Sequence, residues 1–322
     1  MKLRTSAGAV ALALTAALTL TACGDDGADS DPQPEESSSS AAATEAPAPT
    51  AEDVAALEAV TVEGEPGEEP KLTFEAPLEV SAPTTRVVDE GDGDALAEGS
   101  RVTMQYIAYD GNAERLGSTW ETDSPETFIL GDQNYGLLTD ALDGQKVGAR
   151  IMVANSVAGN DGTTQTVLNF LEITDTAPTP SRAEGTAVEP AEGLPTVTLA
   201  DDGAPSIEIP EGYEAPDELV SQPLIKGDGE KVTADQQVYV QYSGWTLDGE
   251  QFDSSWERGV PFTFSMQGGV IPGWIDGVKG QPVGSQLLLV IPADQAYGAE
   301  DDGSHELAGK PLVFVVDVLA AW

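Results

Sequence analysis

The feature that most constrains this chain is an internal repeat. Residues 91–148 align without a gap on residues 227–284, with 18 identities in 58 positions, where average composition would give about 4. Tyr106 and Tyr242 form one such pair, 136 residues apart. A repeat of this length predicts one fold used twice rather than two unrelated domains.

Each copy ends in a similar apolar segment, Val167–Ile173 in the first and Val313–Leu319 in the second. These two segments are 146 residues apart, so the second copy carries ten more residues before its last strand. Each copy also follows a leader rich in β-forming residues, Lys71–Val80 and Thr196–Ile209.

Local patterns in the second copy predict a sheet with one short helix. Val238, Val240 and Tyr242 alternate with their neighbours at the period of a half-buried strand. Residues 287–291 and 312–318 are apolar runs of β-forming residues bounded by proline or glycine. Pro272, favoured in the first turn of a helix, precedes apolar residues at helical spacing. The predicted class is therefore α+β.

Composition sets the boundaries of the domains. Residues 24–51 consist mostly of Asp, Ser, Pro, Ala and Glu, which cannot bury enough apolar surface to offset the entropy of ordering. Residues 176–195 are rich in Pro, Ala and Glu. We therefore predict a signal peptide over 1–22, a disordered lipid-anchored linker over 23–55, a first domain over 60–177, a linker over 178–195 and a second domain over 196–322.

The N-terminus predicts export and lipid attachment. Lys2 and Arg4 precede an apolar run over residues 7–20, which is shorter than a membrane span of ~20 residues and fits a secretory signal. The run ends in Leu-Thr-Ala-Cys, which resembles the bacterial lipobox, and Cys23 is the only cysteine. Two acyl chains on Cys23 would hold the protein on the extracytoplasmic face of the bacterial cell membrane. The alternative is a secreted protein with an unmodified cysteine, or an uncleaved anchor.

The charge excludes several classes of function. The chain has 14 basic and 56 acidic residues, a formal net charge of −42, whereas nucleic-acid binding requires Lys and Arg. We therefore expect no nucleic-acid partner. One cysteine and one histidine, His305, cannot supply the ligands of a Cys-rich or His-rich zinc centre. We expect no metal and no cofactor, and we expect His305 in an exposed loop.

Five blocks of the second copy carry a family resemblance. They are Tyr242-Ser243-Gly244-x-x-x-Asp248-Gly249-x-x-Phe252-Asp253-Ser254-Ser255, Pro261-Phe262-x-Phe264, Val270-Ile271-x-Gly273-Trp274-x-x-Gly277-Val278, Ala296-Tyr297-Gly298 and Leu312-Val313-Phe314-x-Val316-Asp317-Val318-Leu319. In this order and spacing they resemble the FKBP-type peptidyl-prolyl cis-trans isomerases over residues 225–322. The resemblance implies two tandem FKBP-like domains, each a bent antiparallel β-sheet wrapped around a short α-helix.

The resemblance also implies an activity and a site. The activity is rotation about X-Pro peptide bonds in exported proteins, a step that breaks no bond and needs no cofactor. Asp253, Tyr297 and the backbone N–H of Ile271 are implied as the groups that act on the twisting amide. The implied substrate-binding residues are Tyr242, Phe252, Phe262, Val270, Trp274 and Phe314, and Leu307 is expected to supply a further apolar contact. The implied partners are proline-containing exported polypeptides and macrolide-type inhibitors.

Two departures from the family pattern affect these expectations. Residues 299–310 form an acidic loop where the family often has an Ile-Pro-Pro run, which leaves substrate preference open. The first copy replaces the pocket residues of the second with Leu116, Gly117, Glu126 and Leu138. We predict that this copy is non-catalytic and serves to hold a client or as a spacer. For the second copy, the alternative to an isomerase is a non-catalytic chaperone or binding lipoprotein that uses the same groove. A purely structural scaffold fits less well, because the pocket residues of the second copy are intact.

Overall fold

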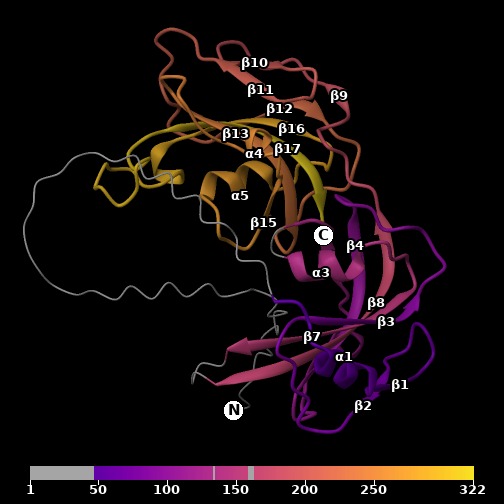
Figure 1. The fold of residues 1–322 in the computed structure, drawn as a ribbon. Coiled ribbons are helices and arrows are strands. Elements are labelled where there is room, and N and C mark those ends of the chain that lie inside the picture. The colour runs from indigo at the N-terminus through magenta and orange to yellow at the C-terminus, as the bar shows by residue number, and fades with distance from the viewer. Residues whose placement is uncertain (1–46, 133–134, 159–162) are drawn as a thin grey trace, which may run out of the picture. The chain divides into compact units, whose positions relative to one another are not determined.

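The computed structural model describes residues 47–132, 135–158 and 163–322, which form two compact units divided after Pro178 (Figure 1). The predicted signal peptide and Cys23 lie outside the described residues. Within the described ranges, every helix is too short or too polar to cross a bilayer.

In its described residues, the first unit has one main sheet, three short helices and a separate hairpin. Its elements are α1 (Ala51–Glu58), β1 (Thr61–Glu63), β2 (Lys71–Thr73), β3 (Thr84–Glu90), β4 (Arg101–Asp110), β5 (Arg115–Ser118), α2 (Thr119–Thr122), β6 (Glu126–Ile129), α3 (Gly136–Leu142), β7 (Ala149–Ala158) and β8 (Thr164–Ala177).

The second unit has a closely similar set of elements. They are β9 (Thr186–Ala187), β10 (Thr196–Leu199), β11 (Pro205–Glu208), β12 (Val220–Lys226), β13 (Gln237–Thr246), β14 (Gln251–Ser254), α4 (Ser255–Arg258), β15 (Phe262–Ser265), α5 (Pro272–Val278), β16 (Gln286–Ile291), the 3₁₀ turn η2 (Ala293–Gln295) and β17 (Leu312–Ala321).

The two main sheets have the same strand order. The first runs β3-β7-β8-β4-β5 with β6 also on β4, and the second runs β12-β16-β17-β13-β14 with β15 also on β13. Positions matched by strand pairing occur in both units: Gln105 lies opposite Glu172 across β4 and β8, and Gln241 lies opposite Asp317 across β13 and β17. Glu172 and Asp317 are 145 residues apart, so the last strands correspond with an offset one residue smaller than the 146 predicted from the sequence. The internal repeat of the sequence is therefore also a repeat of topology.

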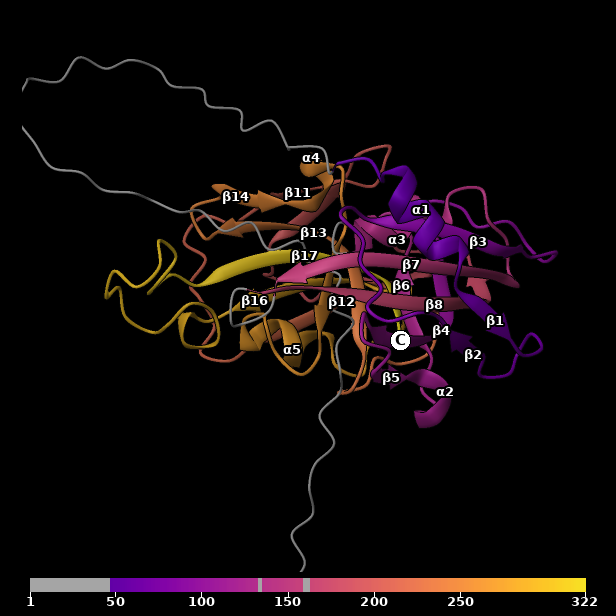
Figure 2. The ribbon, with the colours of Figure 1, turned by 60° about the horizontal axis from the view of Figure 1, so that its bottom comes forward.

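Each sheet buries apolar side chains on both of its faces. On one face lies the helix α3 or α5, over a core that contains Leu138 in the first unit and Trp274 in the second. The other face of the first sheet is covered by α1 and the β1–β2 hairpin, through Leu57 and Leu72. In the second unit the β10–β11 hairpin covers that face, opposite α5 (Figures 1 and 2). Each leader segment thus completes a second core.

The helix α5 approaches its sheet closely because two of its residues are glycines. A Cβ on Gly273 would lie 2.4 Å from Cγ2 of Ile291, and one on Gly277 would lie 2.8 Å from Cδ2 of Leu289. Pro272 occupies the first turn of the helix, as the sequence predicts. The spacing of Trp274 and Val278 then directs both side chains into the core, where both are buried.

The elements predicted for the second copy are confirmed, and two of the boundaries are wrong. The predicted linker over 178–195 belongs to the second unit, because β9 pairs with β12 and Ala183 is buried. The predicted disordered segment extends too far, because residues 51–58 form α1. A capping box between Thr50 and Asp53 starts this helix, and Leu57 anchors it in the outer core.

Candidate active site

The second unit contains a pocket of ≈ 490 Å³ on the helix side of its sheet. Nine of the ten residues predicted for binding or catalysis line it. The complete lining is Tyr242, Phe252, Asp253, Phe262, Gly269, Val270, Ile271, Pro272, Trp274, Ala296, Tyr297 and Phe314. The exception is Leu307, which is buried in the core cluster of this unit and is not among the lining residues.

Aromatic rings form the floor and the walls of the pocket. The indole of Trp274 lies 5.0 Å from the ring of Tyr242 and 5.3 Å from that of Phe314, both nearly perpendicular to it. Phe252 meets Phe314 edge to face at 5.5 Å, and Phe262 lies 6.0 Å from Tyr242. Edge-to-face rings favour one another through their quadrupoles, so the cage is fixed before a ligand enters.

One polar network lies at the edge of this cage. The hydroxyl of Tyr242 donates to Oδ2 of Asp253, and the guanidinium of Arg258 contacts both Oδ1 of that carboxylate and the tyrosine oxygen, the latter at 3.0 Å. The Arg258 guanidinium also lies 5.5 Å from the centre of the Tyr242 ring. Burial, followed by the hydrogen bond to Asp253, raises the pKa of Tyr242 to about 12. Tyr242 therefore stays a neutral donor.

Tyr297 supplies a second hydroxyl. Its side chain is 37% exposed, and burial together with the charge of Asp253 raises its pKa. The exposed His305 stacks on this ring at 3.9 Å, and its Nδ1 accepts a hydrogen bond from the backbone N–H of Leu307. The acidic loop thus contacts the second unit at two places. His305 stacks on Tyr297 at the pocket, and Leu307 packs in the core.

Ile271 offers a backbone donor to the pocket. It is the extended residue before Pro272, at the start of α5. Its N–H has no acceptor among the residues that the structure describes. A backbone N–H without an acceptor at the wall of an apolar pocket is suited to hold a substrate carbonyl, because it can donate a hydrogen bond without first breaking one within the protein.

Sequence reasoning missed two residues of this site. Arg258 was not singled out, although its place three residues after Ser255 in the short helix α4 brings it to Asp253. Gly244 belongs to one of the motifs of the family resemblance, but the sequence does not indicate its role. A Cβ there would lie 2.6 Å from Phe314 and 2.8 Å from Phe252, so the glycine leaves room for two pocket rings.

The equivalent region of the first unit is filled differently. Tyr135, at the position of Ile271, stacks on Phe128 at 4.7 Å, and its hydroxyl donates to Glu126 at 3.3 Å. Burial raises the pKa of Glu126, and burial with the Glu126 charge raises that of Tyr135. Leu138 replaces the indole floor and is fully buried.

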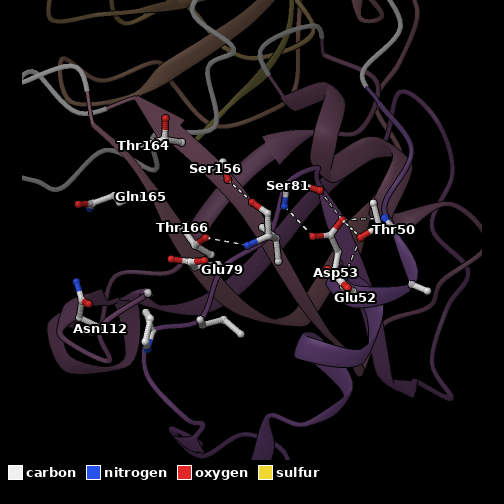
Figure 3. Close-up of a pocket in the computed structure, with 15 residues that line it drawn as sticks. Thr50, Glu52, Asp53, Glu79, Ser81, Asn112, Ser156, Thr164, Gln165 and Thr166 are labelled. Atoms are coloured by element: carbon white, nitrogen blue, oxygen red, sulfur yellow. Dashed lines mark hydrogen bonds between the residues drawn. The ribbon is translucent and has the colours of Figure 1, made fainter.

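A larger hollow of ≈ 800 Å³ lies on the first unit, where Thr50, Asp53 and Ser81 of its lining bond to one another (Figure 3). Asp53 accepts hydrogen bonds from the N–H and hydroxyl of both Ser81 and Thr50. These bonds, led by the Ser81 N–H, hold the pKa of Asp53 well below its usual value. Among the residues that the structure describes, no aromatic side chain lines this hollow. Size alone therefore does not make it the site, and the smaller aromatic pocket is the candidate.

The second-unit pocket suits a planar amide that must rotate. It combines an apolar cage, two tyrosine hydroxyls, one backbone N–H and one paired carboxylate, and its lining, as far as the structure describes it, contains no serine, cysteine or lysine. Rotation about a peptide bond requires no nucleophile, because its barrier of ~18–20 kcal/mol arises from resonance.

Comparisons with known proteins agree with this interpretation. Residues 228–319 match the FKBP-type peptidyl-prolyl cis-trans isomerase family. An FK506-binding protein of Streptomyces anulatus is 42% identical over 119 residues, which cover 36% of this chain and 95% of the relative. An FK506-binding protein of Neisseria meningitidis is 33% identical over 105 residues, covering 32% of this chain and 96% of the relative.

Longer relatives match over the same region. The isomerase FkpA of Escherichia coli K12 is 44% identical over 108 residues, 31% of this chain and 37% of that protein. The crystal structure of Escherichia coli FkpA aligns with 41% of this chain and 52% of that chain, at 34% identity and a TM-score of 0.30. With two short relatives matched over nearly their whole length, and a pocket built from the shared motifs, this chain belongs to the family of FKBP-type peptidyl-prolyl cis-trans isomerases.

Proposed function

We propose that the aromatic pocket of the second unit catalyses rotation about X-Pro bonds in exported polypeptides. The observation that carries this proposal is the position of the Ile271 N–H, which has no acceptor among the described residues. Ile271 lines the same pocket as Trp274 and Asp253. A prolyl ring on the indole would place the preceding carbonyl within reach of donors. The family membership and the names of the relatives support the same reaction.

The pocket accelerates rotation by binding the twisted amide better than the planar one. A planar amide is polar and well solvated, and it loses resonance and polarity as it twists. An apolar cage therefore favours the twisted form, and only interactions that are stronger in the transition state raise the rate. A thousandfold acceleration requires about 4 kcal/mol, which a shaped cage and a few hydrogen bonds can supply. Asp253 is assigned no proton transfer, because the reaction needs none.

Substitution of the polar groups tests this proposal. In a protease-coupled assay with a proline tetrapeptide, we expect Asp253→Ala and Tyr297→Phe to lower kcat/KM by about tenfold each. Trp274→Ala should remove both binding and turnover, because it removes the floor. Full activity in Trp274→Ala would overturn the assignment of the pocket.

A second candidate function is a non-catalytic chaperone or binding lipoprotein that uses the same groove. The acidic loop over residues 299–310 favours this alternative, because it departs from the family pattern while the aromatic cage is intact. Such a change would reduce turnover and leave binding in place. A chain that binds a proline peptide or a macrolide-type inhibitor such as FK506, yet does not catalyse exchange between cis and trans peptide, would establish this alternative.

The proposal extends to the architecture of the chain. We propose two tandem FKBP-like domains, of which the first has lost its pocket. The shared strand order and the matched pairing of Gln105 and Gln241 support this. The altered residues Glu126, Tyr135 and Leu138 support a non-catalytic role for the first domain, such as holding a client or acting as a spacer.

The proposed location is the extracytoplasmic face of the bacterial cell membrane, with a lipid on Cys23. The support is the sequence of the N-terminus alone. Metabolic labelling with a radioactive fatty acid tests it: the wild-type chain should carry label, and Cys23→Ala should not. Label that persists in the variant would contradict lipidation at this residue.

A further inference from the structure

A buried hydroxyl holds the backbone of Tyr242 from the side. Ser255, the first residue of α4, is fully buried. Its Oγ accepts a hydrogen bond from the N–H of Tyr242 at 2.7 Å and lies 3.2 Å from the carbonyl oxygen of the same residue. It also bonds to Oε1 of Gln241. The hydroxyl therefore accepts a hydrogen bond from the Tyr242 N–H, and its single proton is shared between Oε1 of Gln241 and the Tyr242 carbonyl oxygen.

The hydroxyl takes the place of a missing strand partner. Strand β14 pairs with β13 at Ser243 and Gly244, through Ser254 and Asp253. One position further, the chain has already turned into α4, so no backbone acceptor from β14 lies opposite the N–H of Tyr242. An unpaired buried N–H is destabilising, because it has given up its hydrogen bond to water without a replacement. The Ser255 side chain removes this cost and keeps β13 close to the start of α4.

The bond between Ser255 and the Tyr242 backbone positions the tyrosine relative to both of its side-chain partners. The side chain of Tyr242 reaches Asp253 at the end of β14 and Arg258 at the end of α4. Ser255 lies between these two residues in sequence and bonds to the Tyr242 backbone. A shift of β13 away from Ser255 would therefore move the tyrosine hydroxyl relative to both of its partners.

The first unit contains the same attachment with a different side chain. The N–H of Tyr106 donates to Oγ1 of Thr119 at 2.8 Å, and that hydroxyl lies 3.3 Å from the Tyr106 carbonyl oxygen. Threonine is thus an accepted substitute for serine at this position of the fold. Gly117 stands where the second unit has Asp253, so the attachment in the first unit does not position a tyrosine beside an aspartate at that place.

We propose that Ser255 is a positioning residue for isomerisation, which acts by placing the hydroxyl of Tyr242 between Asp253 and Arg258. The inference rests on the proposed function of the second unit. It assigns to Ser255 a role that goes beyond stability, and the two roles can be separated by experiment.

A double-mutant cycle on the full chain separates them, with kcat/KM and the thermal midpoint measured for each variant. We expect Ser255→Ala to lower kcat/KM by about tenfold, and Ser255→Thr to stay within about twofold of wild type. Tyr242→Phe removes the hydroxyl that Ser255 is proposed to place. In that background, Ser255→Ala should lower kcat/KM by less than about twofold, while it lowers the thermal midpoint as much as in the wild type.

Three outcomes would contradict either the positioning role of Ser255 or the isomerase function on which that role rests. A tenfold loss in both backgrounds, or unchanged activity in Ser255→Ala, would overturn the positioning role. If Ser255→Ala does not fold, Ser255→Cys, which keeps the shape but is a weak acceptor, takes its place in the same cycle. A wild-type chain without isomerase activity would overturn the proposed function itself, which is distinct from additive losses in an active chain.

Discussion

Gly244 and Phe314 stand directly opposite each other across β13 and β17, and a Cβ on the glycine would lie 2.6 Å from Cε1 of the phenylalanine. The same carbon would lie 2.8 Å from Cζ of Phe252. In the first unit the corresponding pair is Ala108 and Asn169. The first unit can carry an alanine side chain at this position, because Asn169 takes the place of an aromatic residue on the opposite strand. The size of residue 244 is therefore linked to the presence of the aromatic cage.

The first prediction follows from this contact. Gly244→Ala should lower kcat/KM by about tenfold or more, because the rings of Phe252 and Phe314 must move by several tenths of an ångström. The matched control is Ala108→Gly in the first unit, which should leave activity unchanged. A fluorescence or calorimetric melt shows whether the fold survives. Wild-type activity in Gly244→Ala would mean that the cage tolerates displacement.

A second prediction concerns Arg258. Its guanidinium contacts both Asp253 and the hydroxyl of Tyr242, an arrangement that the single ammonium of lysine reproduces only in part. We expect Arg258→Ala to lower kcat/KM by about tenfold and Arg258→Lys to give an intermediate value. Lys231→Ala, which removes an exposed positive charge of the same unit, is the control. Equal losses in Arg258→Ala and Lys231→Ala would show that only net charge matters.

The third prediction tests the first unit. A fragment over residues 47–178 should fold, because it contains both of its cores, including α1. It should show no isomerase activity, because Tyr135 and Leu138 occupy the region of the pocket. A fragment over 179–322 should keep the activity of the full chain. Activity of the first fragment equal to that of the second would overturn the non-catalytic assignment.

The fourth prediction is a pH dependence of stability. Asp317 is buried, and burial raises its pKa to about 6 from an ordinary 3.8, against the hydrogen bonds from Ala183 and Gln286. A raised carboxyl pKa means that the folded state binds the proton more tightly. The contribution of Asp317 is then greatest below pH 3.8 and is lost as the pH rises through 6.

Relative to Asp317→Asn, the wild type should therefore gain about 2.5 kcal/mol in the free energy of unfolding of the second unit from pH 8 to pH 4. Urea denaturation at a series of pH values measures this difference. Parallel pH profiles for the two proteins would contradict the raised pKa. The variant keeps one acceptor oxygen, so a general loss of structure is not the expected cause of any change.

A fifth prediction concerns the start of α1. The hydroxyl of Thr50 accepts from the N–H of Asp53 at 3.2 Å and caps this helix. Thr50→Ala should cost the first unit about 1 kcal/mol, and Thr50→Ser should retain most of that stability. Chemical denaturation of both variants gives the comparison. Equal stability of the alanine and serine variants would exclude a capping role.

Much of this protein was determined by its sequence alone. The repeat, the alternation around Tyr242 and the apolar run before Leu319 predict the strands, because hydrophobic periodicity is a local property of a chain. Nine of the ten expected pocket residues line the cavity, because a family motif conveys an arrangement that spacing alone cannot. Lipid attachment at Cys23, and the membrane location that follows from it, stay predictions.

Only the tertiary structure decided the role of the segment after Pro178. Its Pro, Ala and Glu composition predicts a linker, because such a segment cannot build a core of its own. It nevertheless folds onto the second unit: β9 adds to the free edge of β12, and the N–H of Ala183 donates to Asp317, 134 residues away. A sheet edge offers unpaired backbone groups to any extended segment. Contacts of this kind, like those of Arg258, join residues through space and leave no pattern in the neighbouring sequence.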